Sequence, residues 1–236
     1  MRPWLTVPII DCGEPLVAIP LELFAFTAPH PYAAVGAPYG GASPWMLRQD
    51  VLAALTEAQA TLAARRPGWR LKLFDAWRPV AVQSFMVWQE FLKQARLAGV
   101  SLEGCSNPQT LQARQPELHD RLAATVYEFW AQPSDDPATP PSHSTGAAID
   151  LTLQDDAGRE IDMGCPIDET TERAYPDHFA HATQPAQQTC HAHRVLLDDV
   201  MTASGFRQHP NEWWHFSLGD QMWAWMRGCA ARYGRI

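Results

Sequence analysis

Apolar and other residues alternate strictly between positions 147 and 153. One set can face a core and the other shares the opposite side: Ala147, Ile149, Leu151 and Leu153 against Ala148, Asp150 and Thr152. A period of two is typical of a half-buried β-strand. A second strand is expected over residues 70–76, and a third from Trp214, after a turn at Asn211-Glu212.

Apolar residues three and four positions apart predict helices in four segments. The first runs from Leu47 to Arg66 and stops at Pro67-Gly68, a pair that ends helices. The second begins near Pro79, because proline suits the first helical turn, and reaches about Leu97. The other two are expected over residues 116–130 and 193–204, with Gly205 as the C-cap of the last.

Loops make up the rest of the prediction. Residues 1–46 are rich in proline, glycine and aromatics and are expected to form short strands and loops that wrap a core. Further loops are expected at 99–116, 133–141 and from 164, and residues 155–159 indicate a turn between antiparallel strands. This order favours an α+β fold with a mostly antiparallel sheet flanked by helices. No linker-like run divides the chain, so residues 1–236 are expected to be a single domain.

Composition narrows the class of protein. The chain has 236 residues, 46% of them hydrophobic, and 10 tryptophans, enough for a substantial core. A formal charge of -8 argues against nucleic acid or an acidic membrane surface as partner. No apolar run is long enough to span a bilayer, and the first residues resemble no signal peptide, so we expect a cytoplasmic protein. The five cysteines are scattered without a C-x-x-C pair and are expected to be reduced thiols. Nothing here indicates an oligomeric state.

The chemistry of the predicted strand at 147–153 centres on Asp150. A carboxylate inside an apolar strand needs a cationic partner, either an arginine or a metal. His143 lies in the Pro/Ser-rich loop before the strand, and Gly146 permits a sharp entry into it. The loop histidine and the strand aspartate can therefore point at one spot. The alternative is an aspartate paired with arginine and a histidine in solvent.

A second candidate pair, Glu212 and His215, lies three residues apart among aromatics near the C-terminus. Zinc hydrolases need an imidazole as metal ligand and a nearby carboxylate that takes a proton from water. E-x-x-H alone is a weak signal, and the pair could simply lie on an aromatic core segment. Together with the H-x6-D spacing of His143 and Asp150 it becomes strong.

Several other residues allow more than one interpretation. Arg78 stands at the predicted strand-to-helix junction, either as a functional group or in an ordinary salt bridge. The pair His178 and His181, and the tract from Cys190 to His193, have metal-like spacing but no carboxylate placed as a base. His30, His119 and His209 are expected at the surface, and Cys165 has no evident base to support thiol chemistry.

Four motifs, in order, resemble the D-alanyl-D-alanine dipeptidase family of zinc peptidases. They are Asp75-Ala76-Trp77-Arg78-Pro79, the run from Ser142 to Leu153, the run from Met163 to Asp168, and Glu212-Trp213-Trp214-His215. The resemblance spans roughly residues 45–220. It implies the small α+β fold shared with D,D-carboxypeptidases and the hedgehog signalling domain.

The resemblance also implies roles for individual residues. His143, Asp150 and His215 would bind one Zn²⁺ per chain, Glu212 would be the general base, Arg78 would stabilise the oxyanion, and Asp168 would bind the substrate's free amino group. The expected reaction is hydrolysis of D-Ala-D-Ala or a closely related dipeptide by a metal-activated water.

One departure leaves the substrate less certain than the chemistry. The family has serine two residues before the first histidine, where this chain has Pro141. Two alternatives stay open: a carboxypeptidase or endopeptidase acting on longer cell-wall peptides, and a non-catalytic zinc-containing recognition module. The biological role, whether glycopeptide resistance, wall recycling or nutrient use, is left open too.

Overall fold

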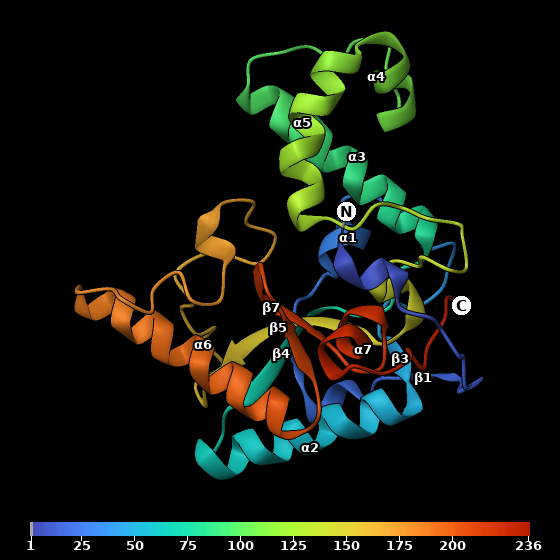
Figure 1. Cartoon of the computed structure of the whole chain (residues 1–236). Coiled ribbons are helices and arrows are strands. Elements are labelled where there is room, and N and C mark those ends of the chain that lie inside the picture. Colours follow the sequence, from blue (N-terminus) through green and yellow to red (C-terminus); the bar gives the residue numbers. More distant parts are fainter. Residues whose placement is uncertain (1) are drawn as a thin grey trace.

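A five-stranded sheet in the order β2-β4-β5-β7-β6 forms the centre of the computed structural model, which describes residues 2–236 (Figure 1). The strands are β2 (Ala25–Phe26), β4 (Arg70–Asp75), β5 (Ala148–Gln154), β6 (Arg207–His209) and β7 (Glu212–Ser217). Only the β2–β4 pair is parallel among these neighbours; the other three are antiparallel. The predicted α+β class with a mostly antiparallel sheet is confirmed.

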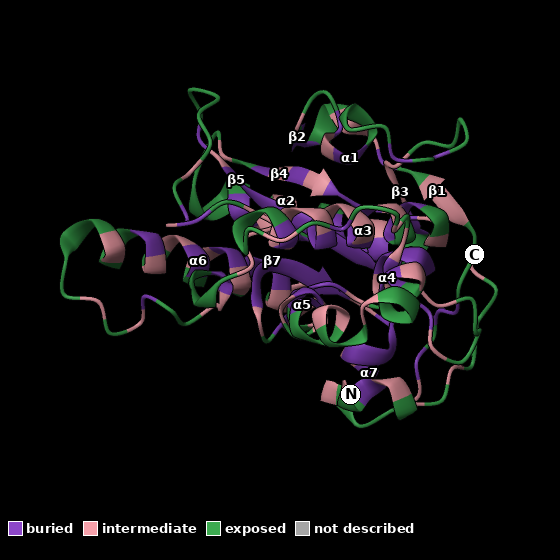
Figure 2. Ribbon diagram, turned by 90° about the horizontal axis from the view of Figure 1, so that it is seen from above, coloured by how far each residue is buried: buried purple, intermediate pink, exposed green. Residues whose placement is uncertain are grey.

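The central strand β5 is buried on both faces, so the prediction of a half-buried strand was wrong. Every residue from Ala148 to Leu153 is buried (Figure 2). The two faces of β5 that the alternating pattern distinguishes are both buried: one faces an apolar core, and the other faces the polar candidate site. Period-two patterns distinguish faces, but a polar face can be covered by other elements as well as by water.

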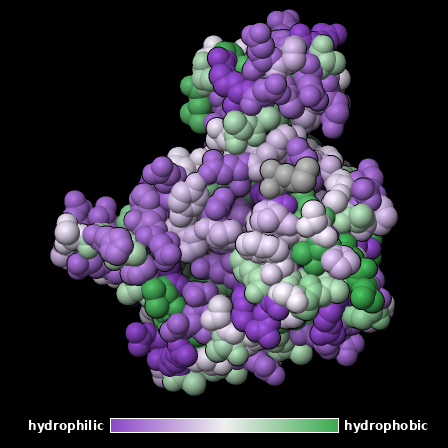
Figure 3. Space-filling view, viewed as in Figure 1, coloured by the Kyte–Doolittle hydropathy of each residue, from purple (hydrophilic) through white to green (hydrophobic). Residues whose placement is uncertain are grey.

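Helices α2 (Gln49–Arg65) and α6 (Pro185–Ala203) pack against each other and against β4 and β6, respectively. Helices α3 (Val80–Leu97), α4 (Pro108–Arg114) and α5 (Pro116–Phe129) form an arm that stands away from the sheet (Figure 1). The surface of this arm is mainly hydrophilic on the face seen in Figure 3. No helix among the described residues has the length and apolarity needed to cross a membrane.

The predicted helices are confirmed in place, with three omissions and one misplaced start. Helix α6 begins at Pro185 rather than His193, and α1 (Pro31–Ala34), α4 and α7 (Gln221–Arg227) were not predicted. Helices α4 and α7 carry ordinary N-caps. Asn107 accepts a hydrogen bond from the Thr110 amide at 2.8 Å, and Asp220 accepts one from the Trp223 amide at 2.8 Å.

The N-terminal segment wraps the core in short elements, as predicted for residues 1–46. These are η1 (Pro3–Thr6), β1 (Leu16–Ala18), η2 (Leu21–Leu23) and α1 (Pro31–Ala34), and β1 pairs with β3 (Met46–Arg48) in a separate two-stranded sheet. The Ile10 amide donates to the Ala231 carbonyl at 2.9 Å, which joins this segment to the C-terminal one. All five cysteines are free, as expected.

The turn between β6 and β7 lies at Pro210 and Asn211, one residue earlier than predicted, and β7 begins at Glu212. The β6–β7 register shifts between Gln208 and His209. Such a bulge re-aims side chains, which accounts for how residues three apart in one strand both reach the site described next.

Candidate active site

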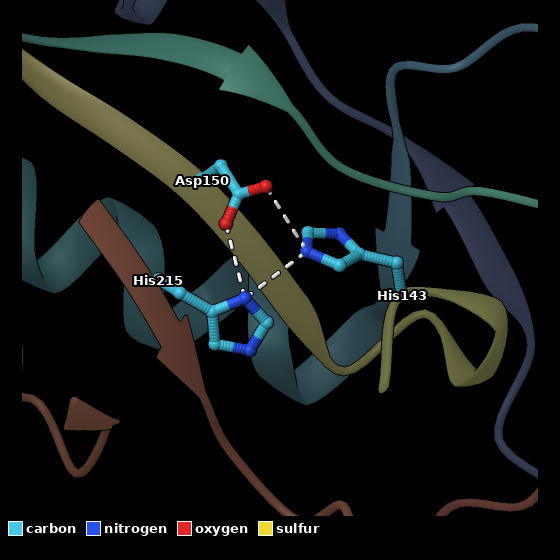
Figure 4. A group of neighbouring side chains, drawn as sticks. All are labelled: His143, Asp150 and His215. Atoms are coloured by element: carbon cyan, nitrogen blue, oxygen red, sulfur yellow. Dashed lines mark hydrogen bonds and ion pairs between the residues drawn. The ribbon is translucent and has the colours of Figure 1, made fainter. Parts of the chain in front are cut away.

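Three predicted ligands converge from three elements. His143 lies on the short 3-10 helix η3 (Ser142–Thr145), Asp150 on β5 and His215 on β7 (Figure 4). The antiparallel register of β5 and β7 places Asp150 directly opposite His215. Gly146 joins η3 to β5 with a φ of 72°, and a Cβ there would lie 2.4 Å from Leu16 Cδ2. Only glycine fits this turn, which delivers His143 to the strand.

The donor atoms of these side chains fit a tetrahedral metal ion. His143 Nε2 lies 3.2 Å from Asp150 Oδ2, and His215 Nδ1 lies 3.0 Å from Asp150 Oδ1. The two ring nitrogens are 3.2 Å apart. Ligands at about 2.0–2.2 Å from a tetrahedral zinc are separated by roughly 3.3 Å, so the observed spacing needs little adjustment.

The outer partners of the two imidazoles leave their lone pairs facing this centre. His143 Nδ1 donates to the Ala76 carbonyl at 2.7 Å, so its Nε2 carries no proton in the neutral ring. His215 Nε2 lies 3.2 Å from Ser217 Oγ, and we assign the proton of the neutral His215 ring to Nε2. Two lone pairs and a carboxylate then meet without a hydrogen between them. A cation satisfies all three.

The electrostatics agree with a site made for positive charge. Burial opposes ionisation of Asp150, but the neighbouring His143 and His215 outweigh it and hold the Asp150 pKa below its usual range. Burial also disfavours protonated His215, yet its hydrogen bond and charge interaction with Asp150 raise its pKa. A metal ion at the centre takes the place of that proton.

Glu212 lies beside the metal-ligand group without joining it. Its Oε2 is 3.7 Å from His215 Nδ1, and its Oε1 is 3.7 Å from His209 Nδ1. Both distances exceed hydrogen-bond length. Burial, with the negative charge of Asp150, raises the pKa of Glu212 to about 7. A carboxylate with that pKa can both accept and return a proton near neutral pH.

Arg78 follows β4 at the start of α3, as predicted, and is buried beside the ligands. Its Nε and Nη2 donate to Asp75 Oδ2 at 2.9 and 2.7 Å, and Nη2 also approaches Asp150 Oδ2 at 3.3 Å. Nη1 donates to Gln83 Oε1 at 2.8 Å. Asp150 is therefore shared between an arginine and the metal-ligand group, so both partners considered for it from the sequence are present.

Asp75 orients the residues around it, a role that the sequence analysis did not assign. It accepts from Arg78 and from Tyr39 OH at 3.2 Å, and its Oδ1 lies 3.1 Å from His30 Nε2. Its Oδ2 is 3.3 Å from His143 Nδ1. Such outer partners fix the direction of a ligand ring. Burial opposes ionisation of Asp75, but Arg78 outweighs it and lowers the Asp75 pKa.

Asp168 carries a half-buried carboxyl group with little compensation. Tyr32 OH lies 3.1 Å from both of its oxygens, and Tyr32 OH also accepts from Arg78 Nη2 at 3.3 Å. Burial and the negative charge of Asp150 raise the pKa of Asp168 to about 8. Asp168 is the one non-glycine residue with positive φ among those described, at 65°. A strained backbone thus holds in the cavity a carboxyl group without an ion-pair partner, which keeps its proton up to a pH of about 8.

One cavity of about 40 Å³ brings all six predicted site residues together. It is also lined by Arg2 and His209, and Tyr32 reaches it through Asp168. The sequence analysis missed these three. His30 and His209 are 7% and 3% exposed, so their prediction as surface residues was wrong, whereas His119 is partly exposed. Their burial depends on long-range packing, and no local motif indicates it.

The competing histidine groups form no comparable site. Among the histidine, cysteine, aspartate and glutamate side chains of residues 2–236, one group of three has donor atoms that all lie close together: His143, Asp150 and His215. His193 Nδ1 lies 2.8 Å from the Asp162 carbonyl instead. Cys165 accepts from Trp213 Nε1 and Arg194 Nη2, both at 3.3 Å, and burial raises the pKa of its thiol. It is a structural cysteine.

Residues 26–232 match the sequence profile described as D-ala-D-ala dipeptidase, within the M15 peptidases. The chain belongs to the D-Ala-D-Ala dipeptidase family. It is therefore a peptidase, and the resemblance found in the four motifs is confirmed. The match leaves out the first 25 residues, and so does not include Arg2.

Relatives in this family extend over most of the chain. The D-alanyl-D-alanine dipeptidase of Synechocystis sp. is 45% identical over 231 residues, which cover 95% of this chain and 90% of the relative. That of Escherichia coli is 32% identical over 173 residues, covering 73% and 66%. A solved structure of the LdcB LD-carboxypeptidase aligns with a TM-score of 0.45 at 13% identity, over 94% of this chain and 77% of that one.

Proposed function

We propose that this member of the family is a zinc-dependent dipeptidase that hydrolyses D-Ala-D-Ala or a closely related dipeptide. The main observation is that the ring nitrogens of His143 and His215 and the carboxylate of Asp150 lie 3.0–3.2 Å from one another. Glu212, which is not a ligand, lies 3.7 Å from the His215 ring. Metal-dependent hydrolases need both parts. The relatives in Synechocystis and Escherichia coli are D-alanyl-D-alanine dipeptidases, which supports the substrate class.

His143, Asp150 and His215 would hold the metal and leave its fourth position open. A bound zinc ion supplies Lewis acidity, which polarises a carbonyl and makes water more acidic. The side chains decide which metal is accepted. Two imidazoles and one carboxylate in a tetrahedral arrangement favour zinc over magnesium or calcium, which prefer six or more oxygen ligands.

Glu212 moves the proton in this proposal. Its carboxylate accepts a proton from the attacking water and then gives it to the nitrogen of the leaving amine. The pKa of about 7 allows both steps without a change of surroundings. No covalent intermediate with the protein is needed, and Cys165, whose thiol pKa is raised by burial, takes no part.

Arg78 would stabilise the negative charge that develops on the carbonyl oxygen. Its side chain lines the cavity, and one N–H of Nη1 is not used by Asp75, Asp150 or Gln83. The charge of an arginine is permanent at any relevant pH. Loss of a comparable oxyanion donor costs about 3–4 kcal/mol in transition-state energy.

Asp168 would bind the ammonium group of the substrate. This half-buried group, with its pKa raised to about 8, gains a counter-ion for its carboxylate form when a free amino terminus enters, and an acetylated terminus offers none. Pro141 lines the cavity without a hydroxyl. The remaining contacts to the ammonium would then come from Asp168 and from backbone carbonyls.

A substrate panel tests this assignment. The wild type and Asp168→Ala should be compared on D-Ala-D-Ala, on its N-acetyl form and on a longer peptide that ends in D-Ala-D-Ala. The wild type should cleave only the free dipeptide well, and Asp168→Ala should lose that preference. Equal cleavage of the longer peptide by the wild type would replace the dipeptidase proposal with a carboxypeptidase.

A further inference from the structure

Arg2 is a positive charge in the lining of the candidate cavity. Its Nη2 donates to the Phe129 and Glu128 carbonyls at 2.9 and 3.4 Å, which caps the end of α5. Arg2 forms no ion pair with an aspartate or glutamate among residues 2–236, and Glu212 is the carboxyl group whose charge acts on it. Arginine has five N–H donors, so its Nε and Nη1 groups stay available to a ligand.

His209 adds an unpaired N–H donor at the same end. The ring is 3% exposed, and its Nδ1 accepts from the Asn211 amide at 3.2 Å. The proton of the neutral ring therefore lies on Nε2, which is buried and has no partner among the described residues. The edge-on packing of the ring against Trp4, at 5.5 Å between centroids, fixes its direction.

Asp168 reaches the metal ligands through Tyr32 and Arg78: Asp168 accepts from Tyr32, Tyr32 accepts from Arg78, and Arg78 donates to the ligand Asp150. His209 reaches them through Glu212, which lies 3.7 Å from both His209 and His215. A carboxyl group and a cation outside any ion pair therefore line one cavity together with the metal ligands. A dipeptide zwitterion has the same two charges, one at each end.

The orientation of the bound dipeptide also follows from the reaction. Glu212 gives its proton to the leaving amine, so the residue that leaves lies on the Glu212 side of the metal ligands. That residue carries the α-carboxylate of a dipeptide, and Arg2 and His209 are the donors that it meets there.

A wider cavity of about 940 Å³ opens beyond this point, and Arg2 and His209 line both cavities. Two further buried atoms without partners lie along it, Asp220 Oδ2 and Gln221 Oε1. Both are acceptors and would not bind a carboxylate. Arg2 and His209, which line both cavities, carry the donors that an anion needs.

We infer that Arg2 and the Nε2–H of His209 bind the α-carboxylate of the leaving residue and so select substrates with a free carboxyl terminus. This inference rests on the proposed dipeptidase function. Arg2 lies in the N-terminal segment, outside the residues that match the family profile.

The test compares D-Ala-D-Ala with its C-terminal amide on zinc-loaded protein. A charge-assisted bond to a carboxylate corresponds to roughly 10- to 100-fold in binding, and the wild type should prefer the free acid by about that factor in kcat/KM. Arg2→Met should bring the ratio near one by raising KM for the acid alone, and Arg2→Lys should keep part of it. His209→Phe, which retains the ring packing, should also lower the ratio. Arg65→Met, an exposed arginine that lines neither cavity, should leave the ratio unchanged.

A merely structural role of Arg2 at the end of α5 would affect acid and amide alike. An unchanged acid-to-amide ratio in Arg2→Met, with both substrates hydrolysed by the wild type, overturns the inference and leaves the proposed function standing. If the wild type hydrolyses neither substrate, the proposed function has failed. Calorimetric titration with D-Ala-D-Ala then decides: weaker binding to Arg2→Met supports the carboxylate site, and equal binding overturns it.

Discussion

Asp168 combines an uncommon backbone conformation with a carboxylate that lacks a counter-charge. Its φ of 65° lies in the left-handed region that asparagine and aspartate tolerate better than most residues. Its neighbours supply hydroxyl donors from Tyr32 but no direct cation. Local strain at such a point is typical of ligand-binding positions. The free-energy cost of ionising Asp168 without a counter-charge makes the stability of the protein depend on pH.

Asp168→Asn should remove that dependence. The pKa of Asp168 is about 8 in the folded protein against 3.8 for the ordinary group, so between these values the folded state holds a proton that the unfolded state lacks. Wild-type stability should fall as pH rises from about 4 to about 8 and then level off. Asparagine keeps the backbone and cannot ionise. The Tm of the variant relative to wild type should therefore rise across this window, by about 2–4 °C per kcal/mol.

Tm measurements at pH 5, 7 and 9 check this, with the exposed Asp177→Asn as the control for a change of charge alone. A Tm difference between Asp168→Asn and wild type that stays constant with pH would contradict the raised pKa of Asp168.

The residues that sequence could identify are those in short motifs. His143 and Asp150 stand out because a carboxylate in an apolar strand needs a partner, and Glu212 and His215 because their spacing fits metal chemistry. Tyr32 and His209 could not be found in this way. Both take their roles from residues distant in the chain: Tyr32 contacts Asp168, and His209 packs against Trp4.

At the scale of elements, one arginine holds the loop that carries Asp168. Arg194 on α6 is buried and donates to the carbonyls of Met163 and Tyr175 at 2.8 and 2.7 Å, and to that of Arg173 at 2.9 Å. This loop includes the short helix η4 (Glu172–Ala174). The flat guanidinium reaches three carbonyls in fixed directions, which a lysine ammonium cannot reproduce.

Arg194→Lys should therefore loosen the loop and misplace Asp168 while leaving the metal ligands intact. We expect a loss on the order of 10- to 100-fold in kcat/KM for the free dipeptide, because small misplacements of a positioning group cost that much. The loss should lie mainly in KM and come with a weaker preference for a free amino terminus. Kinetics on the free and N-acetyl dipeptides, with zinc analysis, measure it. Arg66→Lys, at an exposed arginine, is the control, and an unchanged KM in Arg194→Lys would refute the positioning role.

Element prediction succeeded where apolar periodicity was strong and failed where polar residues begin or form a helix. The first turns of α6 contain Gln187, Gln188 and Thr189, which give no apolar stripe, so the predicted start was late. Helix α4 has an Asn107-Pro108 start with a capping box, a local signal that could have revealed it. The strand β7 was predicted because its aromatic run is typical of strands, although its start at Glu212 is two residues earlier than the predicted Trp214.

At the scale of the whole molecule, the metal ligands join three elements that are far apart in sequence. The helix η3, the strand β5 and the strand β7 each contribute one side chain. The fold class could be predicted because the order of strands and helices and the hairpin turns indicate it. The single domain over residues 1–236 stays a prediction, for which one cooperative unfolding transition in calorimetry is the expected result.

Removal of the metal should destabilise the chain as a whole. A ligand that binds only the folded state adds about 2.7 kcal/mol at a concentration 100 times its Kd, which corresponds to roughly 5–10 °C in Tm for a chain of this size. Metal analysis should find one zinc per chain in the wild type. The Tm should fall after chelation and recover with added zinc. His215→Ala should show neither the zinc content nor the zinc-dependent shift; a full shift in that variant would place the metal elsewhere.

The central claim is that Glu212 serves as the base beside a zinc ion that it does not bind. The most direct measurement is the turnover of free D-Ala-D-Ala by Glu212→Gln, with zinc content determined on the same sample. Glutamine keeps the size of the side chain and cannot take a proton. The account predicts zinc content equal to wild type and turnover lowered by about 100-fold or more. Turnover above about a tenth of the wild-type value at full zinc content would contradict it, since general-base catalysis contributes about 100-fold or more.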